Sequence, residues 1–125
     1  MSEEQSTLNA LAFIYIGFAH STDGELAPEE MRTLAGHIKE WQPDADLAQI
    51  GEVLAEAVAL YQTIDPLDRT DAFRKHGEAI KRDLDVNARV MVLADLEAIS
   101  RADGEITQGE REFIAAMKQI LEVAD

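Results

Sequence analysis

The sequence predicts an all-α protein, a compact bundle of six to seven helices. Apolar residues recur at helical spacing along most of the chain, and no segment alternates with the period of two that a half-buried strand requires. The composition agrees, because 46% of the residues are hydrophobic but only 6% are aromatic, which suits an aliphatic helical core. With 125 residues and no internal linker, residues 1–125 are expected to form one domain.

The first three helices are predicted from apolar spacing and from residues that start or end helices. The first covers about residues 7–21 and is apolar on nearly every side, which is typical of a central helix. Pro28 suits the first turn of a second helix. Asp44 or Asp46 caps a third helix, which residues 64–66 end at a proline.

Three further helices are expected in the second half of the chain. A more polar one covers residues 67–84, and the others cover about residues 86–101 and 108–121. The helix at 86–101 is again apolar almost all round. We therefore expect it and the first helix to be the two most buried, each followed by a loop and an amphipathic partner, in an internal pseudo-twofold helix-loop-helix repeat.

An acidic motif follows both of these apolar helices. It reads TDGELAPEE at residues 22–30 and ADGEITQGE at residues 102–110. Asp, Gly, Glu, an aliphatic residue and a second Glu coincide at five matched places in the two copies. The functional question is whether these two loops hold a cation, hold a partner or only turn the chain.

The carboxylates of the motif are the candidate metal ligands: Asp23, Glu25, Glu30, Asp103, Glu105 and Glu110. Three neighbouring carboxylates repel one another, so such a site protonates, opens into water or gains a cation. Oxygen ligands favour Ca²⁺, Mg²⁺ or Mn²⁺. A standard EF-hand is excluded, because placing Gly24 or Gly104 at loop position six leaves no carboxylate at positions one and three.

The same motif also has a purely structural interpretation. Thr107 followed by Glu110 has the pattern of a capping box, in which the two residues satisfy each other's backbone amides. Aspartate before glycine is ordinary turn chemistry. The residues alone leave both interpretations open.

Other polar residues are weaker candidates. His37 and His76 stand alone in the sequence and are expected at the surface or half-buried, and Trp41 is expected in the core. Asp95 and Glu97 interrupt an apolar helix, where a carboxylate must reach the surface or find a partner. One of these two carboxylates is a candidate to join the second acidic site.

Charge and composition limit the function classes. Eleven basic against 25 acidic residues give a net charge of −14, which disfavours nucleic acid and anionic lipid and favours cations or a basic protein partner. There are no cysteines, which excludes disulfides and thiolate chemistry. No nucleophile, base and orienting residue form a catalytic set, so an enzyme is not expected. The most apolar run, residues 8–19, is too short to span a bilayer, and we expect a cytoplasmic protein.

The repeated motif carries a family resemblance. Its matching residues are Ala19, Asp23, Gly24, Glu25, Leu26 and Glu30, then Asp103, Gly104, Glu105, Ile106 and Glu110. This pattern, in an acidic helical chain, resembles the TerB-like tellurite-resistance family, and the N-terminal domain of a membrane-bound DnaJ-like co-chaperone is similar too. The two copies differ, because Ser100 stands where the first has His20 and Gly109 where it has Glu29.

The resemblance implies a bacterial cytoplasmic protein with a divalent-cation site at the acidic residues. It also implies a role in tellurite or other stress resistance through membrane-associated stress complexes rather than through catalysis. Our leading hypothesis is therefore a non-enzymatic TerB-like protein that binds a divalent cation at one or both acidic loops. The alternative is an acidic protein–protein interaction module whose loops are purely structural.

Overall fold

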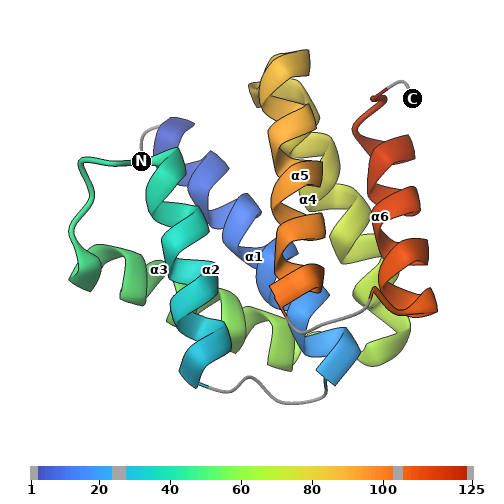
Figure 1. Ribbon diagram of the computed structural model, residues 1–125, viewed down its shortest axis with the longest axis horizontal. Coiled ribbons are helices and arrows are strands. Elements are labelled where there is room, and N and C mark those ends of the chain that lie inside the picture. Colours follow the sequence, from blue (N-terminus) through green and yellow to red (C-terminus); the bar gives the residue numbers. More distant parts are fainter. Residues whose placement is uncertain (1–2, 24–27, 103–105, 124–125) are drawn as a thin grey trace.

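The computed structural model describes residues 3–23, 28–102 and 106–123, and their side chains over residues 7–19, 31–101 and 106–123. The described chain forms α-helices and one short 3₁₀ helix, and contains no strand (Figure 1). The elements in chain order are α1 (Glu3–Asp23), α2 (Pro28–Trp41), α3 (Leu47–Thr63), η1 (Pro66–Asp68), α4 (Arg69–Asp83), α5 (Val86–Ala102) and α6 (Gln108–Ile120). The predicted all-α bundle is confirmed.

Helix α1 forms the centre of the bundle. It packs against each of the other five α-helices, which surround it on all sides. Every residue from Ala10 to Phe18 that carries a side chain is at most 4% exposed. The expected central position of the first helix is confirmed, because a helix that is apolar on nearly every side can hide all of its faces only inside the bundle.

Side-chain caps mark where α3 and η1 begin. Asp46 is the N-cap of α3, since its side chain accepts a hydrogen bond from the backbone amide of Gln49, and the Gln49 side chain accepts one from the Asp46 amide. This reciprocal arrangement satisfies two amides that the helix itself leaves unpaired. Asp65 caps η1, where Pro66 is the first residue. Of the two caps predicted for α3, the chain uses Asp46.

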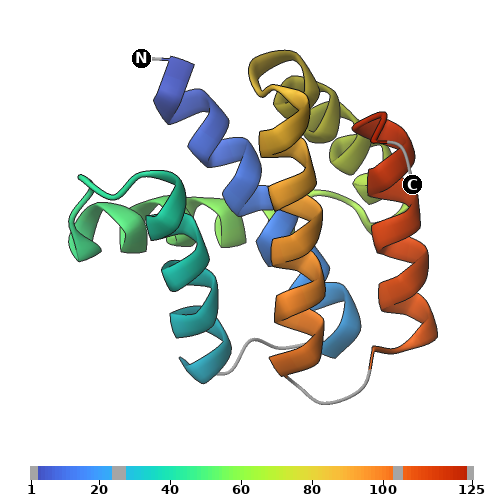
Figure 2. The same ribbon diagram turned by 45° about the horizontal axis from the view of Figure 1, so that its top comes forward.

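Helix α5 differs from the expected second buried helix. Its Val92, Leu96 and Ile99 are buried, but Val90 and Met91 are 46% and 55% exposed. Although it was expected to be one of the two most buried helices, α5 is enclosed less than α1, because it lies at the edge of the bundle. It packs one side against α1, α2 and α6, and no described element covers the opposite side (Figure 2).

The helix ends that flank the two acidic motifs lie at one end of the bundle. The last turns of α1 and α5 and the first turns of α2 and α6 are found there in both views (Figures 1 and 2). Residues 24–27 and 103–105 lie outside the described part of the chain. The internal pseudo-twofold repeat therefore stays a prediction. Within the described residues, none of the helices has the length and apolarity needed to cross a membrane.

Candidate functional site

The six predicted metal ligands are described unequally. The side chains of Asp23, Glu25, Glu30, Asp103 and Glu105 lie outside those that the structure describes. Only the Glu110 side chain is described, and it is 4% exposed. The structure therefore neither brings these carboxylates together nor separates them.

Glu110 makes the capping box that its spacing from Thr107 predicted. The Thr107 hydroxyl accepts a hydrogen bond from the Glu110 amide at 3.1 Å, and Glu110 Oε1 accepts one from the Thr107 amide at 2.8 Å. These two bonds start α6 and satisfy backbone donors that have no partner within the helix. The structural interpretation of this residue is confirmed, and one of its two carboxylate oxygens is used by the cap.

A polar cluster that was not predicted from the sequence lies between α1, α2 and α5. At its centre, the carboxylate of Asp95 accepts two hydrogen bonds on Oδ2, from the Tyr15 hydroxyl at 2.5 Å and from Trp41 Nε1 at 2.9 Å. Trp41 Nε1 also lies 3.1 Å from the Tyr15 hydroxyl. Asp95 had been expected to find a partner or the surface, and it finds these two partners.

Burial keeps the Tyr15 hydroxyl of this cluster protonated. The side chain is 0% exposed, and its hydroxyl faces the carboxylate of Asp95. Burial, followed by the negative charge of Asp95, raises the pKa of the Tyr15 hydroxyl well above its usual value of 10.0. Tyr15 is therefore a hydrogen-bond donor to Asp95 and is neither a nucleophile nor a base near neutral pH.

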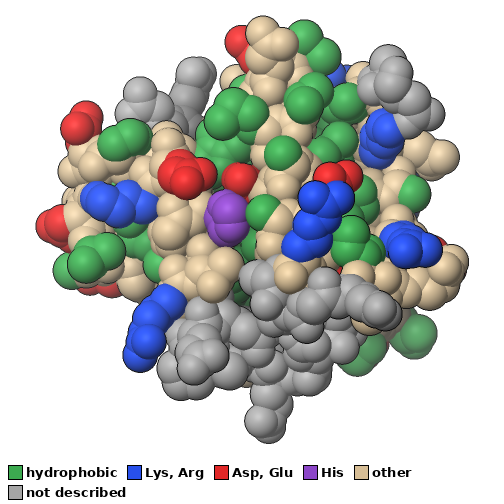
Figure 3. Space-filling view, viewed as in Figure 1, with side chains coloured by type: hydrophobic (Ala, Val, Ile, Leu, Met, Phe, Trp, Pro, Cys, Tyr) green, Lys and Arg blue, Asp and Glu red, His purple; other side chains and the backbone are tan. Residues whose placement is uncertain are grey.

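His37 and Glu40 complete the cluster from α2. His37 Nδ1 lies 3.2 Å from Asp95 Oδ1, and the side chains of these two residues are 18% and 14% exposed. Ligand atoms of His37, Glu40 and Asp95 all lie within 4.8 Å of one another, and Glu40 is exposed. Figure 3 shows histidine and acidic side chains gathered on the face where α2 and α5 lie side by side.

The approach of His37 to Asp95 is close but oblique. The distance of 3.2 Å would suit a hydrogen bond. However, His37 Nδ1 is fully buried and has no hydrogen-bond partner among the described residues, because the ring nitrogen is not directed at the oxygen. A hydrogen bond weakens steeply with misalignment, so the short distance alone does not make one. The two atoms are neighbours that do not satisfy each other.

The other polar candidates have structural surroundings. His76 stacks on the buried ring of Phe13 with centroids 4.1 Å apart, and its Nδ1 lies 2.8 Å from the carbonyl oxygen of Ala72. Glu97 is exposed, so it reaches the surface, the other outcome expected for a carboxylate on this helix. Trp41 is partly buried and packs against the core, as expected.

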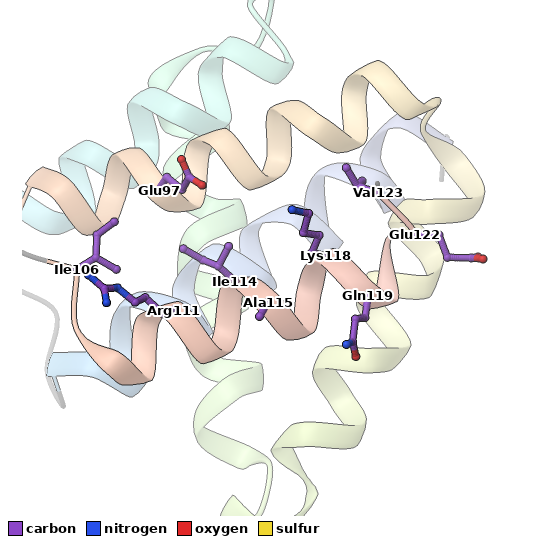
Figure 4. A pocket seen from close by; sticks show the side chains of 9 residues that line it. All are labelled: Glu97, Ile106, Arg111, Ile114, Ala115, Lys118, Gln119, Glu122 and Val123. Atoms are coloured by element: carbon purple, nitrogen blue, oxygen red, sulfur yellow. The ribbon is translucent and has the colours of Figure 1, made fainter. Parts of the chain in front are cut away.

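A groove of about 520 Å³ runs between α5 and α6. Figure 4 shows Glu97 on α5 facing Ile114 and Lys118 on α6 across it. Two acidic and two basic side chains line the groove together with Gln119 and several apolar residues; the charged ones are Glu97, Arg111, Lys118 and Glu122. This groove presents neither a set of convergent charges of one sign nor a catalytic pair, so it is a weaker candidate site than the cluster around Asp95.

The cluster around Asp95 was not predicted from the sequence, although one spacing in the sequence pointed to two of its residues. His37 is half-buried, as expected, but its neighbour Asp95 was not predicted. His37 and Glu40 are separated by three positions in a helix, a spacing that places two side chains on one face. That spacing was the available signal. Nothing local connects this pair to Asp95, which lies on a different helix 54 positions after Trp41.

Comparison with known proteins identifies the family. The family model described as "Tellurite resistance protein TerB" matches residues 10–125. No curated protein and no solved structure gave a match in the other two comparisons. The family match covers nearly all of the 125 residues, including all six α-helices in whole or in large part. The chain therefore belongs to the TerB family of tellurite resistance proteins.

Proposed function

We propose that this TerB family protein is non-enzymatic and binds a divalent cation at one or both of its acidic helix junctions. The cation is Ca²⁺, Mg²⁺ or Mn²⁺, because the candidate ligands are carboxylates, and hard cations prefer oxygen. We propose that the protein acts in the bacterial cytoplasm, in resistance to tellurite, which the family description names, or to another stress.

One observation supports this proposal above the others. The helix ends that flank both acidic motifs lie at the same end of the bundle (Figures 1 and 2). A chain with a net charge of −14 therefore carries both copies of its acidic motif between helix ends at the same end of the bundle. Repulsion between carboxylates in such an arrangement is relieved when a cation binds.

The candidate ligands differ in what they contribute. The leading candidates lie at or just beyond the ends of the two apolar helices: Asp23, Glu25, Asp103 and Glu105. Glu110 Oε1 already accepts the hydrogen bond from the Thr107 amide, which leaves Oε2 as the freer of its two oxygens for a cation. Glu30 stands at the position of the first copy that matches Glu110.

Thermal unfolding in the presence of each cation tests the proposal. A ligand at about 100 times its dissociation constant stabilises the folded protein by about 2.7 kcal/mol, which raises the midpoint by several degrees. We expect this rise for the chelator-treated protein after adding Ca²⁺, Mg²⁺ or Mn²⁺. The double variant Asp23→Asn with Asp103→Asn should lose the rise while it keeps its helical circular dichroism.

A matched control separates ligation from a general effect of charge. Asp44→Asn with Glu52→Gln removes the same formal charge at exposed positions away from the junctions, and should keep the full response. If the midpoint of the wild type rises no more than in monovalent salt of equal ionic strength, the junctions do not bind these cations.

The negative charge also supports a partner of opposite charge. Twenty-five acidic residues on a chain of this size favour a basic protein, and we propose such a protein, within a membrane-associated stress complex, as the partner. Binding of this kind weakens as salt screens the charges.

A further inference from the structure

The cluster around Asp95 has the composition of a metal site. It joins one imidazole and two carboxylates, whose ligand atoms all lie within 4.8 Å of one another. His37 and Glu40 come from the same face of α2, and Asp95 comes from α5. Helical bundles hold pairs of metal ions with a glutamate and a histidine three positions apart on one helix and a glutamate from a facing helix; here the order is reversed, with His37 before Glu40.

We propose that His37, Glu40 and Asp95 form a transition-metal site that is separate from the acidic junctions. A site of this composition takes Zn²⁺, Co²⁺ or a similar divalent ion, because imidazole suits these metals while Ca²⁺ and Mg²⁺ prefer sites built of oxygen alone. Three protein ligands leave at least one coordination position for water or for a ligand from another molecule.

The oblique contact between His37 and Asp95 fits this assignment. Zn²⁺ is bound at about 2.0–2.2 Å by nitrogen or carboxylate oxygen. Two ligand atoms 3.2 Å apart can therefore share an ion that lies about 40° off the line between them. In that geometry each atom points at the ion and neither points at the other. This accounts for a buried His37 Nδ1 that has a carboxylate beside it and no hydrogen bond to it.

Asp95 is already oriented for such a role. Its Oδ2 accepts hydrogen bonds from Tyr15 and Trp41, which leaves Oδ1 facing His37. Outer hydrogen bonds that fix a carboxylate are characteristic of metal sites, because they reduce the freedom that the ligand loses on binding. Glu40 is the exposed one of the three ligands.

The visible absorption of bound Co²⁺ tests the proposal directly. The titration uses the wild type and the variant Asp23→Asn with Asp103→Asn, which removes leading ligands of the acidic junctions. We expect both proteins to give the same Co²⁺ spectrum and Zn²⁺ to displace it. This outcome is independent of the proposed junction sites, because the double variant lacks aspartates from both of them.

Substitution of the ligands should abolish the spectrum. We expect His37→Gln and Glu40→Gln each to weaken Co²⁺ binding by more than the roughly 10–100-fold that loss of an outer-shell partner causes. Glu40 is exposed, so Glu40→Gln leaves the fold intact even if His37→Gln does not. The emission of Trp41, the only tryptophan, should change with Zn²⁺ in the wild type and not in Glu40→Gln.

Two further variants serve as controls. Glu56→Gln removes an exposed carboxylate from α3, and His76→Gln removes the histidine that stacks on Phe13, so both should bind Co²⁺ as the wild type does. Two results overturn the site: a wild type that gives no Co²⁺ spectrum, or a Glu40→Gln or His37→Gln variant that binds Co²⁺ with unchanged affinity. In either case the cluster only joins the three helices.

Discussion

Helices α1 and α5 are similar in sequence and different in surroundings. Both are long, both are apolar almost all round, and both precede an acidic motif. Yet Ile14 in the middle of α1 is 0% exposed, whereas Met91 of α5 is 55% exposed. The difference arises because five helices surround α1, while α5 packs on the bundle from one side.

The central and the peripheral helix therefore have different roles in the bundle. An apolar helix at the centre stabilises the fold through every face. An apolar helix at the edge buries one face and keeps the other in contact with solvent, so its polar residues are free to form a site. The two helices are joined by the hydrogen bond from Tyr15 to Asp95, which connects the most buried helix to the cluster.

The largest expected difference between the two helices is in the cost of truncation. Ile14→Ala in α1 should lower the free energy of unfolding by about 2–5 kcal/mol, because it removes buried atoms and leaves a cavity. Met91→Ala in α5 should change it by no more than about 0.5 kcal/mol, because the side chain is largely in water already. Urea unfolding of both variants measures the two values.

A milder variant guards against the case in which Ile14→Ala does not fold. Ile14→Val removes less and should cost about 0.5–1.5 kcal/mol, which is still more than the change at Met91. Equal losses at the two positions would contradict the contrast between a central and a peripheral helix. Such a result would indicate that the exposed side of α5 is covered in solution, for instance by a second molecule.

The second-largest expected effect is the loss of stability when a residue of α1 is enlarged. A methyl group added at Gly17 would overlap the ring of Phe73, which is itself held between other rings, at 5.5 Å from Phe13 and 5.1 Å from Phe113. We expect Gly17→Ala to destabilise the protein by about 1–3 kcal/mol, as overpacking does. The midpoint of urea unfolding at unchanged slope gives the value.

Gly36 of α2 provides the matched control for Gly17. Nothing lies within 4 Å of a methyl group added there, so Gly36→Ala should stabilise the protein by about 0.5–1 kcal/mol through helix propensity alone. The two identical substitutions should thus have opposite signs. Stabilisation by both would mean that Phe73 moves aside at little cost and that α1 is less tightly enclosed.

The helices and the central position of α1 could be predicted from the sequence, but the partial exposure of α5 could not. Apolar spacing, Pro28 and the Thr107–Glu110 pair are local signals, so they predict where helices begin and end. Whether α5 is enclosed depends on which helices surround it, and no local pattern records that. The candidate site divides in the same way, because Asp95 was expected to need a partner, but its hydrogen-bond donor Tyr15 lies 80 positions away.

The smallest expected effect is the pH dependence of the hydrogen bond from Tyr15 of α1 to Asp95 of α5. The raised pKa of Tyr15 means that the folded state keeps this hydroxyl protonated where the unfolded chain would release its proton. Its contribution to stability is fully present below pH 10 and is lost as the pH rises from there toward the raised pKa. In chelator-treated protein, the loss should be at most about 1.4 kcal/mol per pH unit. Tyr15→Phe should lack this component, so its unfolding free energy should fall less steeply between about pH 10 and 11. The slopes are compared, and not the absolute values, because Tyr15→Phe also removes the hydrogen bond to Asp95 at every pH. Parallel plots of unfolding free energy against pH for the two proteins would show that the pKa of Tyr15 is not raised by folding.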